Sequence, residues 1–402
     1  MADEQATYDL IIVGGGVYGI LTALEATRRK LRPLLLERGA FAGATSANSL
    51  RILHGGLRYL QSLDFRRAAV SIRERAWWLR EFPEATRPLA CLMPLYGEGL
   101  RRPEVFRLAL ALNERIARAQ GDDVLPPGRV IGRQAVLDLF PSAASSGLRA
   151  GALWYDGFAP DMTRLLHEAL RRAESAGAIA HDRVEAVGVV VARKRVVGVR
   201  ARDLRSGTEA VWHAPLVINA AGPWSARFAS ACGSPAPELF RPLLAWNVVF
   251  DRAPLSACAL AVRARTPAAQ TWFLAPRDGR LVAGTGYAAW PQGTDQVAVP
   301  DPELERFIVA LNEAVPGLEL SRSEVAQIDA GLLPATSDGG TVLAQQPVVV
   351  DHGAREGPAG LFSVSGVKLT TARAVAARLL DRALPSGRAT VRPAAEPALD
   401  HG

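Results

Sequence analysis

The feature that most constrains the fold is a glycine-rich turn between a short apolar run and a helical pattern near the N-terminus. Residues 8–13 form a β-branched run, and Gly14-Gly15-Gly16-Val17-Tyr18-Gly19 follows at once. A helical pattern continues to Arg29, and residues 32–36 are a second apolar run that ends in Glu37. This order predicts a strand, a tight turn, a helix and a parallel strand.

Each part of this unit has a reason to bind a dinucleotide. Gly14 permits the tight turn, Gly16 lets the backbone approach a pyrophosphate, and Gly19 lets the helix pack closely on the sheet. The helix N-terminus offers amide donors and partial positive charge to the anion. Glu37 ends the second strand, where it is placed to accept hydrogen bonds from a ribose. The residues predicted to bind cofactor at this end are Gly14, Gly16, Val17, Tyr18, Gly19, Glu37 and Arg38.

Two later segments return to the same sheet and favour FAD over NAD. Residues 216–222 are a strand that runs into a glycine turn, and residues 361–368 are a strand followed by a helix. Strand-like runs in residues 241–300, separated by Gly and Pro, predict an antiparallel sheet, and no separate nicotinamide domain is seen. We predict an α/β fold: a Rossmann-like FAD-binding domain, discontinuous in sequence, plus an α+β substrate domain with a mainly antiparallel sheet. The expected FAD-binding parts are 1–90, 151–235 and 331–385, the substrate or cap parts are 91–150 and 236–330, and the tail is 386–402.

Several helices and one hairpin are expected from the hydrophobic pattern. Helices are predicted over residues 60–82 and 104–120. Asp161 is the expected N-cap of a helix that reaches residue 176. Residues 179–202 alternate like a hairpin, and a last helix is expected over residues 368–384.

Composition narrows the class of protein. The 402 residues are 49% hydrophobic, which is enough for two domains, and no window holds the roughly 18 uninterrupted apolar residues of a membrane span. Three cysteines, Cys91, Cys232 and Cys258, fit free thiols in a reducing compartment, so we expect a cytoplasmic protein. The net charge of +7 comes from arginines without basic runs between aromatics, which argues against nucleic-acid binding. It leaves open a peripheral contact with the inner face of the membrane. The six histidines lack ligand spacing, and no metal is expected.

Residues 45–60 carry a specific family resemblance. Their sequence, TSANSLRILHGGLRYL, resembles the signature of FAD-dependent glycerol-3-phosphate dehydrogenases. The resemblance recurs at residues 155–157 (YDG), 219–224 (NAAGPW), 281–285 and 365–373 (SGVKLTTAR), so it spans nearly the whole chain. The broader superfamily includes D-amino-acid, glycine and sarcosine oxidases and shares a two-domain plan. The resemblance implies FAD as the cofactor.

The resemblance also implies roles for individual residues. The loop with Thr45 and Ser46 would wrap the flavin and its phosphates, and Arg58 would contact the substrate. Lys368 would lie beside flavin and substrate, where its charge and the following helix N-terminus stabilise negative charge on the flavin. Plainer alternatives are a surface lysine and a salt bridge of Arg58 within the flavin domain. The predicted cofactor-binding set is completed by Val184, Ala221, Gly222, Trp224, Gly366, Val367, Leu369 and Thr370.

His54 lies between an apolar pair and two glycines, a position expected close to the isoalloxazine ring. It could orient the ring, accept a proton or carry a covalent flavin link, and a packing role is an equal alternative. The catalytic base is one of His54, Tyr59 and Lys368, and the sequence does not choose among them.

The sequence departs from the family pattern in three places. Leu333 stands where the family has a phosphate-binding arginine in a Gly-x-Arg-Pro motif. The loss of this arginine should weaken binding of a dianionic substrate by roughly 1.5 to 3 kcal/mol per charged hydrogen bond. Asn247 replaces a histidine, and Gly286-Tyr287 replaces a Thr-Asp pair. We therefore expect a bulkier or neutral substrate, bound by Arg58, Asn247, Tyr287 and Leu333. The extra C-terminal helical domain of the family is expected to be absent.

These observations predict an FAD-dependent dehydrogenase or oxidase of a small molecule. It would move a hydride from a carbinol carbon to flavin N5, while a nearby base takes the second proton. The alternatives are an amine or amino-acid oxidase of the same superfamily and a non-catalytic flavin-binding protein. The electron acceptor (quinone, oxygen or a carrier protein) and the oligomeric state stay open.

Overall fold

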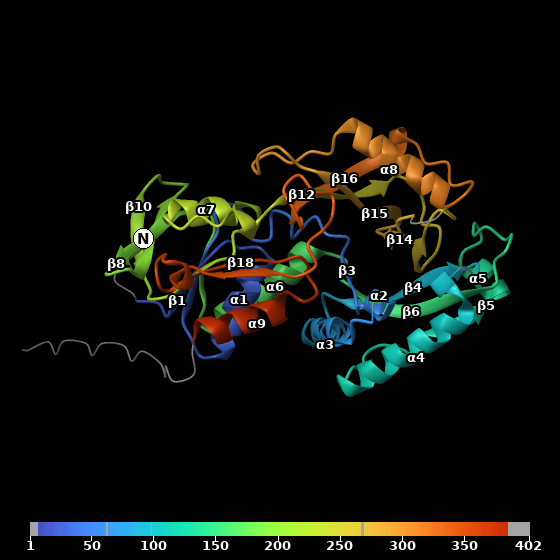
Figure 1. Cartoon of the computed structure of the whole chain (residues 1–402), viewed down its shortest axis with the longest axis horizontal. Helices are drawn as coiled ribbons and strands as arrows, with labels where there is room; N and C mark the ends of the chain where they lie inside the picture. The colour runs from blue at the N-terminus through green and yellow to red at the C-terminus, as the bar shows by residue number, and fades with distance from the viewer. Residues whose placement is uncertain (1–6, 62, 98, 267–268, 385–402) are drawn as a thin grey trace, which may run out of the picture.

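The computed structural model describes residues 7–61, 63–97, 99–266 and 269–384. Their strands form a six-stranded, a three-stranded and a nine-stranded sheet. In Figure 1 the first two sheets lie in one half of the molecule and the nine-stranded sheet in the other. The mixed parallel and antiparallel architecture confirms the predicted α/β fold class.

The six-stranded sheet has the order β17-β18-β11-β1-β2-β7, with β1 between β11 and β2. All four residues of β1 are buried, as expected for a parallel strand covered on both faces. The antiparallel partner β17 closes one edge. The strands come from three separate parts of the chain, so the predicted discontinuity is confirmed: β1 (Leu10–Val13), β2 (Pro33–Leu36), β7 (Ile179–His181), β11 (Val217–Asn219), β17 (Val348–Asp351) and β18 (Leu361–Ser365).

Helices and a small sheet cover the two faces of this sheet. On one face α1 (Val17–Arg28) packs against α6 (Met162–Ser175) and α9 (Ala372–Ala383), and Trp78 of α3 (Phe65–Glu81) joins the same core. The other face packs on the three-stranded sheet through Val184, Val196 and Val199, while α7 adds Phe228. The small sheet contains β8 (Val184–Ala192), β9 (Arg195–Asp203) and β10 (Glu209–His213), and α7 spans Ser225–Ala231.

The nine-stranded sheet has the order β16-β12-β15-β14-β13-β4-β6-β3, with β5 beside β6. Its pairs are antiparallel except β4 with β13. Helix α8 packs Phe307 against Trp246 and Trp272, and α4 packs Phe106 and Leu110 against other strands. The elements are α2 (Leu57–Gln61), α4 (Pro103–Ala119), α5 (Arg133–Leu139), α8 (Asp301–Ala314), β3 (Ile52–Leu53), β4 (Arg87–Leu95), β5 (Arg129–Gly132), β6 (Ala150–Phe158), β12 (Pro242–Phe250), β13 (Ala259–Val262), β14 (Trp272–Arg277), β15 (Arg280–Ala289) and β16 (Val325–Pro334).

Some local predictions differ from the structure. The helix expected over residues 60–82 is divided into α2 and α3, because the Asp64 carboxylate accepts a hydrogen bond from the Arg67 amide and begins a new helix. The hairpin is β8–β9, whereas residues 179–181 pair with β2. The last helix begins at Ala372 rather than at residue 368, so Lys368 lies in an irregular link after β18. The N-cap role of Asp161 is confirmed by its bond from the Arg164 amide.

The sheets also bear on the expected domain limits. Strand β6 belongs to the nine-stranded sheet, although residues 151–158 were expected with the FAD-binding part, and β16 extends that sheet to Pro334. The division into domains stays a proposal, with these strands moved to the substrate side. The expected tail 386–402 lies outside the described residues. Among the described helices, none has the length and apolar character needed to cross a membrane.

Candidate active site

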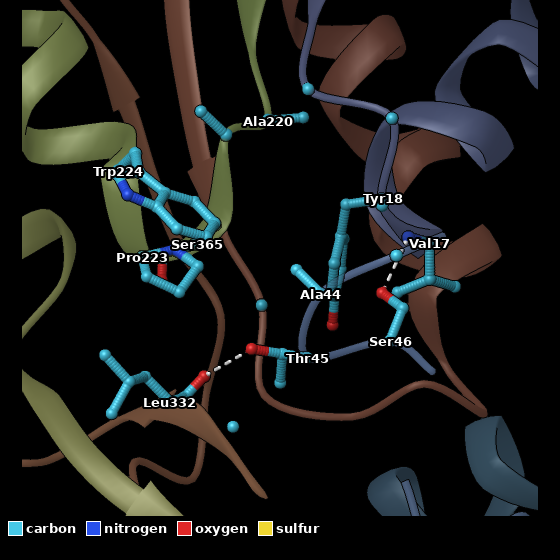
Figure 2. Close-up of a pocket in the computed structure, with 18 of the residues that line it drawn as sticks. Val17, Tyr18, Ala44, Thr45, Ser46, Ala220, Pro223, Trp224, Leu332 and Ser365 are labelled. Carbon is cyan, nitrogen blue, oxygen red and sulfur yellow. Dashed lines mark hydrogen bonds between the residues drawn. The ribbon is translucent and has the colours of Figure 1, made fainter. Parts of the chain in front are cut away.

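A cavity of about 850 Å³ lies where the carboxyl ends of β1, β2, β11 and β18 meet one end of the nine-stranded sheet. This volume is in the upper part of the range for small-molecule sites. Its wall includes residues from β12, β15 and β16, so both large sheets contribute. Figure 2 shows Tyr18 and Val17 on one side of it and Pro223 and Trp224 on the other, with Thr45 beside Leu332 of β16.

The glycine turn forms one end of this cavity. Gly14 has a φ of +104°, and a Cβ there would lie 2.7 Å from the Ala220 carbonyl oxygen. A Cβ on Gly19 would lie 1.8 Å from the Gly14 oxygen, so the first turn of α1 is pressed against the turn that precedes it. The Val17 amide donates to Ser46 Oγ at 3.1 Å (Figure 2), which ties the 45–46 loop to the start of α1. The N-terminus of α1 therefore faces the cavity, where it favours an anion.

Glu37 is held rigidly at the end of β2. One carboxylate oxygen accepts from the Gly15 amide and the other from the Gly39 amide, each at 2.6 Å. Its neighbour Arg38 lines the same end of the cavity, and Val184 of β8 lies there too. A fixed carboxylate beside an anion-accepting helix end is the arrangement that binds an adenosine ribose and its phosphates.

The Tyr18 side chain holds the backbone of Lys368 in place. The Tyr18 hydroxyl donates to the Lys368 carbonyl oxygen at 2.9 Å and accepts from the Lys368 amide at 3.3 Å. Burial raises the pKa of Tyr18 well above its ordinary value, so the hydroxyl stays protonated. The Trp78 indole donates to the Thr370 carbonyl oxygen, which fixes the far side of the link. The Lys368 ammonium then stands 4.0 Å from the centroid of the Tyr59 ring.

Around Asn247 and Thr285, the described polar side chains that line the cavity are neutral. Asn247 Oδ1 accepts from Thr285 Oγ1 at 3.0 Å, and Asn247 Nδ2 donates to the Asn48 carbonyl oxygen at 3.0 Å. Thr45 Oγ1 donates to the Leu332 carbonyl oxygen at 3.2 Å (Figure 2), so the 45–48 segment joins β16 and β12. Leu333 lines this part of the cavity. Within the described part of the chain, the cations that line the cavity are Arg38, Arg227 and Lys368.

His54, whose side chain is 44% exposed, contacts a buried ionic network and lies outside the cavity lining. Its Nδ1 lies 3.2 Å from Asp156 Oδ2, while Asp156 Oδ1 accepts from the Gly55 amide at 2.7 Å. Arg75 Nη1 donates to Asp156 Oδ1 at 3.2 Å, and Arg75 Nη2 donates to Asp122 at 2.6 Å. Burial alone would raise the pKa of Asp156, but the hydrogen bond from His54 and the nearby charges lower it to about 2. The carboxylate is therefore ionised and holds the His54 Nδ1–H.

The structure brings most of the predicted site residues together. Gly19 and Thr370 support the cavity from behind, and His54 and Tyr59 stand outside its lining. Arg58 lies on α2, and its side chain falls outside the described residues. The predicted residues that line the cavity are Gly14, Gly16, Val17, Tyr18, Glu37, Arg38, Thr45, Ser46, Val184, Ala221, Gly222, Trp224, Asn247, Tyr287, Leu333, Gly366, Val367, Lys368 and Leu369.

Among the lining residues that sequence reasoning missed are Asn48, Thr285, Arg227 and Asp295. Asn48 lies within residues 45–60, so the family resemblance of this segment could have indicated it. Asp295 had no signal, because only the fold brings its loop to the cavity. Across the described ranges, no three His, Cys, Asp or Glu side chains are grouped to hold a metal ion.

The lining residues fit FAD. The cavity joins a glycine cradle in which a Cβ would collide with backbone, a fixed carboxylate and a second end wide enough for a ring system. These features match the adenosine, pyrophosphate and flavin parts of one dinucleotide.

Comparisons with known proteins agree with this geometry. The family model described as FAD dependent oxidoreductase (DAO) matches residues 9–382. A glycerol-3-phosphate dehydrogenase of Synechocystis sp. is 30% identical over 393 residues, covering 94% of this chain and 70% of the relative. An alpha-glycerophosphate oxidase of Streptococcus pyogenes is 30% identical over 338 residues, covering 83% of this chain and 55% of the relative. The chain thus spans only part of the length of these relatives.

Solved structures share the fold. The glycerol-3-phosphate dehydrogenase from Bacillus halodurans, complexed with FAD, has a TM-score of 0.72 at 22% identity, covering 94% of this chain and 65% of that one. The L-proline dehydrogenase from P. horikoshii has a TM-score of 0.68 at 16% identity, covering 93% of this chain and 92% of that one. At these identities the likeness concerns the fold.

The contact between Gly19 and Gly14 generates the first prediction. Gly19→Ala places a methyl group into the Gly14 carbonyl, so α1 must shift, at a cost of about 1 to 3 kcal/mol in the free energy of unfolding. We expect the purified variant to contain less bound FAD than the unaltered protein, measured by absorbance near 450 nm per mole of protein. Gly132→Ala is the matched control, because a Cβ there meets no atom within 4 Å. Equal FAD content in both variants would contradict the assigned role of Gly19.

The lowered pKa of Asp156 generates the second prediction. Its carboxylate stabilises the fold at every pH above its ordinary pKa of 3.8, and this contribution is lost as the pH falls through about 2. Asp156→Asn should therefore lower the free energy of unfolding at neutral pH. The difference between the two proteins should narrow by about 2 kcal/mol from pH about 4 to pH about 2. Urea unfolding at several pH values measures it, and a difference independent of pH would refute the ionised assignment.

Proposed function

Because the chain belongs to the FAD dependent oxidoreductase family, we propose that it oxidises a small alcohol-type substrate that carries no phosphate group. The chain is an FAD-dependent oxidoreductase related to glycerol-3-phosphate dehydrogenases and oxidases, and FAD is its cofactor. Bound FAD supplies the acceptor for a hydride, at N5 of its isoalloxazine ring. The substrate, the acceptor of the electrons and the residues that act on the substrate belong to this proposal.

The residues proposed to hold the cofactor lie along the cavity in a fixed order. Glu37 takes the adenosine ribose, and the amides at the start of α1 take the pyrophosphate. Ser46 is fixed by the Val17 amide, beside the amides proposed to take the pyrophosphate. Lys368 marks the flavin end, because its link follows β18 and is locked to Tyr18.

Lys368 is proposed to stabilise negative charge that develops during substrate oxidation. Both backbone groups of this residue are bonded to Tyr18, so little reorganisation is needed when the charge appears. Its ammonium also contacts the Tyr59 ring face, which holds a cation without neutralising it. Lys368 also lines the cavity.

His54 is the residue we propose as proton acceptor for the substrate hydroxyl. Asp156 keeps the proton on Nδ1, so Nε2 is left as the basic nitrogen. The centroids of the His54 and Phe273 rings are 5.1 Å apart. Phe273 of β14 pairs with Gly284 of β15, and Gly284 pairs on its other side with Asn247 of β12, which lines the cavity. This register supports a position for His54 on the face of the sheet that carries Asn247. Tyr59 and Lys368 remain the alternative bases.

The position of Leu333 is the observation that carries the substrate proposal. Leu333 lines the cavity end that also holds Asn247 and Tyr287. An alkyl side chain cannot donate charged hydrogen bonds to a phosphate dianion, so Leu333 offers such a group no partner. Asn247 and Thr285 instead offer a neutral donor and acceptor pair, which suits a hydroxyl group.

The same neutral end also suits a carbon that bears an amine, which is the second candidate substrate. An amine in its neutral form donates to Asn247 Oδ1 as a hydroxyl does, and the aromatic ring of Tyr287 gives it an apolar wall. The electron acceptor is a quinone, oxygen or a carrier protein. Each is compatible with oxidation of either substrate by hydride transfer to FAD.

The substrate proposal is tested by restoring the missing charge. Leu333→Arg places a guanidinium in the cavity wall, and one or two charged hydrogen bonds to phosphate should tighten binding of glycerol 3-phosphate by roughly tenfold to a hundredfold. The measurement is the concentration of glycerol 3-phosphate that gives half-maximal reduction of the flavin without oxygen. Val342→Arg adds the same charge at a position that is 58% exposed, and serves as the control. Equally tight binding by the unaltered protein would contradict the proposal.

A further inference from the structure

One loop of the nine-stranded sheet reaches the dinucleotide half of the molecule. The segment of residues 291–299 joins β15 to α8, and in Figure 1 the chain before α8 extends toward α7. We call this segment the strap. Its residue Asp295 lines the cavity, together with residues of the dinucleotide half.

Asp295 contacts groups from two separate parts of that half. The Trp224 indole donates to Asp295 Oδ1 at 2.8 Å, and Arg227 Nη1 donates to Oδ2 at 3.4 Å. Arg38 Nη1 lies 3.6 Å from Oδ1, and the Arg38 guanidinium also stands 5.4 Å from the centroid of the Trp224 ring. One carboxylate thus links the segment after β2 with the segment after β11.

These contacts mark the adenosine end of the cavity. Arg38 directly follows Glu37, and Trp224 and Arg227 follow the turn at the end of β11. Lys368 and Leu333 belong to the flavin end and make none of these contacts among those described. The contacts of Asp295 therefore lie at the adenosine end of the cavity.

The strap is anchored at both ends and exposed at its tip. Trp290, just before it, is buried and donates to the Gly293 carbonyl oxygen at 2.9 Å. Val297 and Val299 pack against the core of the nine-stranded sheet. Asp295 lies between these anchors with a side chain that is 58% exposed. A short loop held this way can move at its tip while its ends stay in place.

We propose that the strap retains bound FAD, with Asp295 as the ionic latch that closes the adenosine end of the cavity. The indole hydrogen bond and the two guanidinium groups hold the pKa of Asp295 below its ordinary value, so the latch is charged at neutral pH. FAD passes this end only when the carboxylate leaves Arg38, Arg227 and Trp224.

The strength of the latch follows from its exposure. Arg38 and Arg227 are 42% and 55% exposed, so each ion pair with Asp295 is partly screened by water and salt. A latch of this kind opens often, and it affects the rate of cofactor release more than the stability of the fold. Its contribution should fall as ionic strength rises.

The test is the rate of FAD release from the holoprotein, followed by the rise of free-flavin fluorescence after dilution. Asp295→Asn keeps the size of the side chain and an acceptor for Trp224, but removes the charge. We expect release several-fold faster than from the unaltered protein. Sodium chloride should speed release from the unaltered protein and have little effect on the variant.

Two further variants keep the result interpretable. Arg227→Gln removes one partner of the latch and should speed release in the same direction. Asp251→Asn breaks an exposed ion pair with Arg280 in the nine-stranded sheet, outside the cavity lining, and should leave the rate unchanged. A rate from Asp295→Asn that equals or falls below that of the unaltered protein would overturn the proposal. The assay uses no substrate, so this outcome is independent of which compound the enzyme oxidises.

Discussion

The close contact of α1 with the turn before it is the constraint on which the rest of the site depends. Only glycine at positions 14 and 19 leaves room for the helix to begin at the end of β1. That position points the helix N-terminus into the cavity and sets Tyr18 beneath the link that follows β18. Lys368, about 350 residues away in the chain, is then fixed through its own backbone. One steric requirement near the N-terminus therefore places the cationic residue of the flavin end.

The cavity lies on the seam between two sheets, and short-range hydrogen bonds keep that seam closed. The 45–48 segment bonds to β16 through Thr45 and Asn48, and to β12 through Asn247. These bonds use neutral groups and leave the flavin end with little charge beyond Lys368 among the described lining residues. The adenosine end differs, because its arginines meet Asp295 from the opposite half. We propose that one end of the cavity retains the cofactor and the other recognises the substrate.

Local sequence patterns predicted the first glycine turn and several elements, whereas the family resemblance supplied many of the predicted residues that line the cavity. The glycine turn, the buried runs and Asp161 each have local chemical causes, and the structure has them where expected. The network of Arg75, Asp122 and Asp156 around His54 could not be predicted, because only β6 and α3 bring these distant residues together. Asp295 could not be predicted either, because only the fold brings its loop to the cavity. The misplaced start of the last helix reflects tertiary bonds: Tyr18 and Trp78 hold residues 368–370 out of helical form.

The most direct test of the account is the absorbance of the flavin in the purified protein, mixed without oxygen with glycerol, other polyols, hydroxy acids, amines and glycerol 3-phosphate. The account predicts bound FAD that is bleached rapidly by a neutral alcohol or amine and only poorly by glycerol 3-phosphate. Rapid bleaching by glycerol 3-phosphate alone would show that another residue replaces the missing arginine and would contradict the specificity. Bound FAD that no compound bleaches would indicate a flavin-binding protein without catalysis.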